Sequence, residues 1–220
     1  MCEERYLSLD LESTPRLGYR LTCTDPERRR RFARALRLAV KLANDAAQKL
    51  TTSPVDKNIS RLFVFFFGTT PEYWVSWAKM TAGALVAHRF KTAARELAGA
   101  RRVTYTCEAG VTGHCGAGTN AVTSGPVSVR LCDGFWINGG RDRTEAQMAG
   151  TLLHEGLHAV YRALFSHAER RGVPRPRIAE CRRDNTRCFH AFALRAAGYG
   201  ADRYLIPQCR RSAAQCTTRR

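Results

Sequence analysis

The segment AGTLLHEGLHAVY, residues 149–161, contains two histidines four positions apart. Residues four apart lie on one face of an α-helix, so His154 and His158 can direct both imidazoles at one ion. Zinc accepts neutral imidazole nitrogens at about 2.0–2.1 Å. Glu155 lies about 100° round the helix, where it can reach a water on that ion. The HExxH spacing therefore predicts a hydrolytic Zn²⁺ site with His154 and His158 as ligands and Glu155 as catalytic base, rather than two core histidines.

A helix must position this motif, and the flanking residues indicate where it runs. Thr144 is a suitable N-cap, and the leucines at 152, 153 and 157 supply a buried side. No breaker follows before Gly172, so we expect the helix to continue that far. A second helix is predicted from RIAECRRDNTRCFHAFALRAA, residues 177–197, ending at Gly198.

The upstream chain mixes helical and extended patterns. Asp25 and Pro26 predict the start of a helix with apolar residues at helical spacing. Another upstream helix is predicted from Pro71 to about Leu97. The apolar run LFVFFFG, residues 62–68, is interpreted as a buried strand, and the alternating RRVTYTC and GPVSVRLC segments predict two more strands. The fold class is therefore α+β, mainly helical with a small β-sheet. We expect residues 1–24 to be an extended N-terminal segment and 25–220 to be one domain.

Composition limits the classes of partner. The 220 residues carry a net charge of +17, with basic residues spread along the chain and without a nucleic-acid-binding motif. We therefore interpret the charge as a solvated basic surface and expect no specific nucleic-acid partner, with attraction to acidic partners as the alternative. No apolar run is long enough to span a membrane. The N-terminal residues contain no apolar signal core, so we expect either that a signal was removed or that export uses another route.

The nine cysteines indicate the compartment. No CxxC pair occurs, which argues against a structural zinc ribbon, and the wide spacing favours disulfides in an oxidising environment. We expect a secreted protein. Because nine is odd, at least one cysteine is unpaired within the chain, and Cys2 near the terminus is the preferred one.

Several segments together resemble the deuterolysin and lysine-specific metalloendopeptidase family, the aspzincins. The order YRLTC, a long alanine-rich helix, FFFG, TYTC and VSVRLCDGFW before AGTLLHEGLH is similar to that family over most of the chain. The resemblance implies a zincin-like fold and a secreted, zinc-dependent endopeptidase acting on protein substrates. It also implies the disulfides Cys23–Cys107 and Cys115–Cys132, with two further bridges of open connectivity among the cysteines at 181, 188, 209 and 216.

The chain departs from the family after the second histidine. The family has a Gly-Thr-x-Asp-x-x-Tyr-Gly segment there, whose Asp is the third zinc ligand, whereas this chain has RALFSHAERRG. A gap-free match places His167 at the Asp position, but on an unbroken helix it would lie about 180° from His158. Asp184 matches a family Asp in a pocket for a lysine side chain, and Arg187 replaces its companion Glu. We therefore expect lysine specificity to be lost.

The motif alone does not specify the third zinc ligand. Glu180 and Asp184 are four apart and resemble the gluzincin arrangement, in which a Glu on a later helix ligates zinc and an Asp one turn on hydrogen-bonds a ligand histidine. The order of preference is Glu180, then Asp184, then His167, with Asp184 otherwise supporting the site or binding substrate. The overall prediction is a monomeric zinc metalloendopeptidase with a protein or peptide substrate. The alternative is a non-catalytic or highly target-specific effector or toxin on an aspzincin scaffold.

Overall fold

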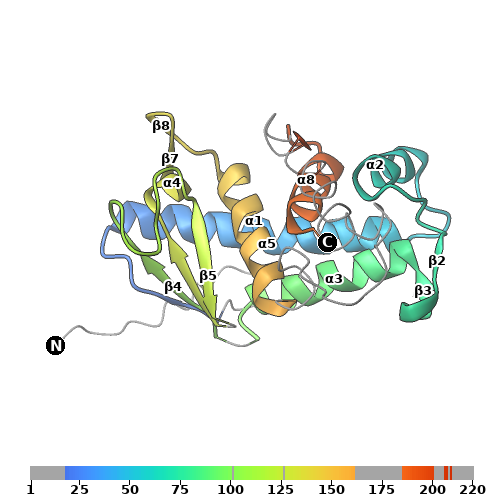
Figure 1. Ribbon diagram of the computed structural model, residues 1–220, viewed down its shortest axis with the longest axis horizontal. Coiled ribbons are helices and arrows are strands. Elements are labelled where there is room, and N and C mark those ends of the chain that lie inside the picture. The colour runs from blue at the N-terminus through green and yellow to red at the C-terminus, as the bar shows by residue number, and fades with distance from the viewer. Residues whose placement is uncertain are drawn as a thin grey trace, which may run out of the picture. The chain divides into compact units, whose positions relative to one another are not determined.

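The computed structural model describes residues 18–100, 102–125, 127–161, 185–200, 206, 207 and 209. Over these ranges the fold is α+β and mainly helical, with six α-helices and small sheets, as predicted (Figure 1). Contacts divide the chain into two compact units. Unit 1 comprises Met1–Val40 and Ala93–Val160, and unit 2 comprises Lys41–Thr92 and Tyr161–Arg220. No helix in the described part of the chain is long and apolar enough to cross a membrane.

Unit 1 contains a four-stranded sheet in the order β1-β4-β6-β5. The strands are β1 (Arg20–Leu21), β4 (Thr104–Cys107), β5 (Ala121–Gly125) and β6 (Ser128–Leu131). β4 pairs in parallel with β1 and β6, whereas β5 pairs antiparallel to β6 and forms one edge. The strands predicted from TYTC and VSVRL are confirmed, with Val129 and Leu131 buried at alternate positions of β6.

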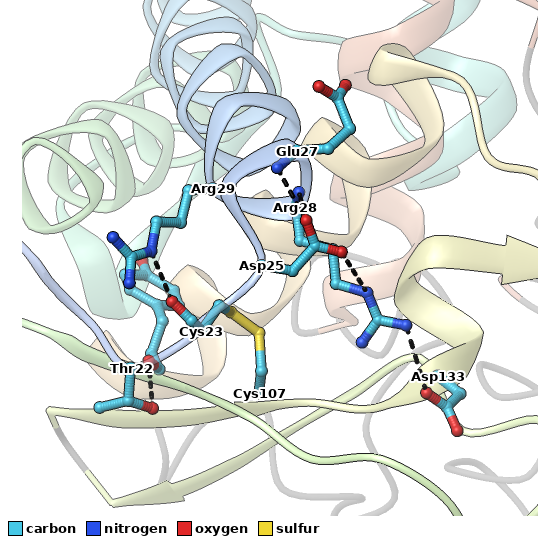
Figure 2. The surroundings of a disulfide bond; sticks show 9 residues. Thr22, Cys23, Asp25, Glu27, Arg28, Arg29, Cys107 and Asp133 are labelled. Atoms are coloured by element: carbon cyan, nitrogen blue, oxygen red, sulfur yellow. Dashed lines mark hydrogen bonds and ion pairs between the residues drawn. A yellow bond between two sulfur atoms is a disulfide. The ribbon is translucent and has the colours of Figure 1, made fainter.

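Helix α1 (Pro26–Thr51) begins where its sequence predicts. The Asp25 carboxylate accepts hydrogen bonds from the backbone N–H groups of Glu27 at 2.8 Å and Arg28 at 3.3 Å, which satisfies two donors at the helix start. Just before this cap, the disulfide Cys23–Cys107 joins the chain to the end of β4 (Figure 2). The predicted bridges Cys23–Cys107 and Cys115–Cys132 are both confirmed.

The core of unit 1 forms where α1 packs on the sheet. Phe32 of α1 lies 4.7 Å from Tyr105 of β4 between ring centroids, and Tyr19 lies 5.3 Å from Phe32. The short helix α4 (Asp133–Trp136) adds buried Phe135 and Trp136. The strands β7 (Ile137–Asn138) and β8 (Arg141–Asp142) then lead the chain from this core towards the motif helix.

Unit 2 corrects the interpretation of LFVFFFG, residues 62–68, as a strand. This stretch lies in helix α2 (Lys57–Phe67), whose N-cap Asp56 accepts from the N–H groups of Asn58 and Ile59 and whose C-cap Gly68 has φ 70°. The physical reason is the spacing of burial. Phe63, Phe66 and Phe67 face inward while Val64 and Phe65 are exposed, which is helical periodicity rather than alternation. The helical signal in the sequence was the pair of capping residues, Asp56 before the run and Gly68 at its end.

The predicted helix from Pro71 to Leu97 is right only over its second part. Residues 74–81 form a hairpin of β2 (Trp74–Val75), a 3₁₀ turn η1 (Ser76–Ala78) and β3 (Met80–Thr81), and helix α3 spans Ala82–Leu97. Lys79 adopts φ 51° and reverses the chain between η1 and β3. The Thr81 hydroxyl accepts from the Ala84 N–H and so caps α3.

Unit 2 also contains helix α8 (Thr186–Ala196). Its start corrects the helix predicted over 177–197, because Asn185 has extended φ and ψ and its side chain caps the Arg187 N–H. Phe189 and Phe192 of α8 pack against aromatic rings of α2 and α3, including Phe67 at 5.2 and 5.3 Å. The disulfide Cys188–Cys209 fixes one of the pairings that the sequence left open.

Candidate metal centre

Helix α5 (Glu145–Val160) carries the HExxH motif and begins as predicted. The Gln147 N–H donates to the Thr144 hydroxyl at 3.3 Å, and the Thr144 N–H donates to the Gln147 side chain at 2.9 Å. This reciprocal pair is a capping box, which fixes where the first turn starts and hence which face each later residue occupies.

The far end of α5 differs from the prediction. The helix ends at Val160, and Tyr161 has no regular secondary structure, so the expectation of an unbroken helix to Gly172 is wrong. Absence of a breaker residue does not by itself extend a helix, because tertiary packing decides most boundaries. Because α5 ends before residue 167, the 180° separation expected on an unbroken helix does not apply to His167. His167 itself lies outside the described residues.

The apolar side of α5 packs as the sequence suggests. Leu152, Leu153 and Leu157 are fully buried in unit 1. Gly156, inside the motif, lies against Leu97, and a Cβ there would come within 3.1 Å of that side chain. The small residue therefore permits a close approach of α5 to Leu97.

The two histidines converge. The Nε2 atoms of His154 and His158 lie 3.1 Å apart, and both rings are half-buried. The ring centroids are 4.7 Å apart with an interplanar angle of 76°. Two nitrogens bound to one tetrahedral zinc at about 2.0–2.1 Å would lie about 3.3 Å from each other. The observed 3.1 Å is the length of an N–H···N hydrogen bond between the two rings and is also close to the separation of two zinc-bound nitrogens.

Glu155 points away from its own helix towards strand β5, which lies beside α5 (Figure 1). The Thr123 hydroxyl lies 2.6 Å from Glu155 Oε2, and the same hydroxyl lies 3.3 Å from the Glu155 backbone oxygen. The Glu155 side chain is buried, with 6% of the residue exposed. One carboxylate oxygen is thus held by the edge strand of the sheet.

Burial also changes the acidity of this carboxyl group. Desolvation raises the pKa of Glu155 to about 7, and the hydrogen bonds from Thr123 oppose part of that rise. A group with a pKa near neutrality can both accept and return a proton at physiological pH. A divalent cation at the imidazole pair would lower this pKa, because positive charge favours the carboxylate.

The predicted third ligands are not placed by the structure. Glu180, Asp184 and His167 all lie outside the described residues, and helix α8 begins after Glu180 and Asp184. Among the residues that are described, no group of three or more His, Cys, Asp or Glu side chains is close enough to hold a metal ion. Among the described residues, the candidate metal ligands that lie together are therefore His154 and His158.

Thr123 is the site residue that sequence reasoning missed. It belongs to no motif, and the strand AVTSG that carries it was not predicted among the glycine-rich residues around it. Its role depends on β5 pairing antiparallel to β6, which brings position 123 opposite Val129 and against α5.

Comparison with models of known protein families and with curated protein sequences finds no match for this chain.

Proposed function

We propose that this protein is a zinc-dependent metalloendopeptidase whose centre is built on α5. The observation that carries the proposal is the 3.1 Å separation of the His154 and His158 Nε2 atoms, on a helix that also holds a buried glutamate. Two neutral rings at this distance can share one N–H···N hydrogen bond, and the same approach presents two neutral nitrogens to one ion when both ring protons lie on Nδ1. Convergence of both Nε2 atoms on one point supports a shared cation.

Each residue of the motif has a distinct role in this proposal. His154 and His158 would hold Zn²⁺ through Nε2 in their neutral form, which requires the proton of each ring on Nδ1. When bound, the zinc ion would polarise the scissile carbonyl and acidify water. Glu155 would take a proton from the attacking water, and Thr123 would keep its Oε2 in place so that Oε1 receives that proton.

One carboxylate can serve both proton transfers of peptide hydrolysis, because the proton taken from the water is the one that the leaving nitrogen needs. The water oxygen forms a bond to the carbonyl carbon, the C–N bond breaks, and the leaving nitrogen needs a proton. Glu155 would carry the proton from the water to that nitrogen, first as base and then as acid. A pKa near neutrality suits both steps, and a bound cation would bias the group towards the base form.

The third ligand remains part of the proposal, in the order Glu180, Asp184, His167, with Asp184 as the alternative partner of a ligand histidine. The substrate would be a protein or peptide.

The net charge of +17 favours acidic protein or peptide substrates. By the resemblance to the aspzincins, Arg187 in place of the family Glu would disfavour a lysine side chain. The disulfides support secretion into an oxidising compartment.

The test compares zinc content and casein cleavage in the full chain and in three variants. We expect about one zinc ion per chain in the wild type and in Glu155→Gln, with cleavage lost in that variant by at least about a hundredfold. His154→Ala and His158→Ala should lose both zinc and cleavage. Cleavage by Glu155→Gln at the wild-type rate would remove Glu155 from the mechanism.

A second function is favoured by one feature of the sequence, the loss of the Gly-Thr-x-Asp segment after His158. An effector or toxin on the same scaffold could bind one target without cleaving general substrates. Zinc content separates this from an inactive scaffold: a chain that retains zinc but does not cleave casein would favour a target-specific enzyme. A chain without zinc at neutral pH would favour a binding protein.

A further inference from the structure

A short segment of unit 2 exposes an unusual concentration of aromatic side chains. Trp74 and Trp77 are 58% and 62% exposed, and Tyr73 is 44% exposed. The third tryptophan of the chain, Trp136, is only 1% exposed. Tryptophan is highly buried on average, so two exposed tryptophans only three positions apart indicate an interaction surface rather than ordinary surface composition.

The hairpin geometry explains why these rings are outside. Trp74 pairs with Thr81 and Val75 pairs with Met80 across β2 and β3. Because neighbouring strand residues face opposite sides, burial of Val75 directs Trp74 outward. Trp77 lies in the turn η1, and Lys79 follows it with φ 51°. The tip therefore presents an indole and an ammonium group within three residues.

The exposed side of α2, which precedes this hairpin along the chain (Figure 1), has the same mixture of side chains. Lys57, Arg61 and Phe65 are exposed and recur every four residues, so they lie along one face, and exposed Val64 lies on that face too. Cationic and apolar side chains are thus exposed together both on this helix and at the hairpin tip.

We propose that the exposed residues Lys57, Arg61 and Phe65 of α2 and Trp74, Trp77 and Lys79 of the hairpin together form one surface, which docks on an anionic lipid membrane. Tryptophan and tyrosine favour the interface between headgroups and acyl chains, and each Lys or Arg near an anionic leaflet strengthens binding about fivefold. The net charge of +17 adds long-range attraction to such a surface and opposes self-association.

Other occupants fit the same residues less well. Single-stranded nucleic acid requires a cationic track along its backbone, whereas this surface has three cations interrupted by Glu72 and by aliphatic Val64. A second copy of the chain would bring like charges together. This inference is independent of the proposed peptidase activity, since neither the histidine motif nor Glu155 takes part.

The experiment is co-sedimentation of the full chain with phosphatidylcholine vesicles that contain or lack phosphatidylserine. We expect binding to the anionic vesicles, with a blue shift of tryptophan emission because Trp74 and Trp77 leave water. Trp74→Ala and Trp77→Ala should each weaken partitioning about tenfold, which corresponds to partial transfer of the exposed indole area out of water. Lys79→Glu should weaken it by about fivefold or more.

Control variants at other exposed positions distinguish docking through these residues from attraction by the net charge of the whole chain. Lys91→Glu changes the net charge equally at another exposed position, and Val111→Ala removes an exposed apolar side chain of unit 1. Both should bind nearly as the wild type does. The proposal is overturned if anionic vesicles do not bind, or if both tryptophan variants bind like the wild type. Dimerisation lost in those variants, or binding to oligonucleotides without vesicle binding, would equally overturn it.

Discussion

Replacing Thr123 by valine tests how the edge strand holds Glu155. Valine keeps the branched shape of threonine but removes the hydroxyl that donates to Glu155 Oε2 at 2.6 Å. A hydrogen bond to a charged group contributes about 1.5–3 kcal/mol, and loss of a donor to a buried carboxylate lies within that range. At pH 8, where the carboxyl is ionised, we expect the free energy of unfolding to fall by about 2 kcal/mol. The melting temperature should fall by about 4–8 °C.

The loss of unfolding free energy in Thr123→Val should depend on pH, and it should come from the missing hydroxyl rather than from the change of shape. At pH 5 the carboxyl is protonated, because its pKa is raised to about 7, so a neutral hydrogen bond is lost and the cost falls to about 1 kcal/mol. Denaturant unfolding of metal-free protein at both pH values measures this difference. Thr123→Ser, which keeps the hydroxyl, is the matched control and should lose less at pH 8. Equal losses for serine and valine, or no loss for valine, would refute the reasoning.

Three further changes have predictable outcomes. In metal-free protein the raised pKa of Glu155, about 7 against an ordinary 4.5, means that folded chain binds this proton more tightly than unfolded chain. Stability from this group is therefore complete below about pH 4.5 and lost by about pH 7, a fall of about 3 kcal/mol that Glu155→Gln should lack in parallel melts. Asp56→Ala removes the N-cap of α2 and should cost about 1 kcal/mol in denaturant unfolding, with Asp56→Asn close to wild type. Phe192→Ala should cost about 3–5 kcal/mol by the same assay, since its ring contacts Phe63, Phe66, Phe67 and Phe90; Phe192→Leu should cost less.

The sequence predicted those elements whose signals are local. The start of α5 followed from Thr144, the start of α1 from Asp25, and two strands from alternation. The α2 segment was misassigned because an apolar run of strand length is ambiguous unless its caps are included. The hairpin at 74–81 was missed because Pro71 was taken as a helix start, whereas the cap that starts α3 is Thr81.

The candidate site likewise combines residues that the sequence predicts from local spacing with one that it does not predict. The spacing of His154 and His158 places both rings on one face from the sequence alone, and the structure brings their Nε2 atoms together. Thr123 could not be found by any local pattern, because it reaches Glu155 only through the pairing of β5 in the sheet. The residues proposed as third ligands depend on the path of the chain after Tyr161, which no short motif in this sequence specifies.

The most direct measurement of the central claim is zinc-edge X-ray absorption on the zinc-loaded chain and on His154→Ala. The account predicts two imidazole nitrogens at about 2.0–2.1 Å from the zinc in the wild type and the loss of one of them, with much weaker binding, in the variant. A zinc ion bound without imidazole ligands, or a spectrum unchanged by His154→Ala, would contradict it.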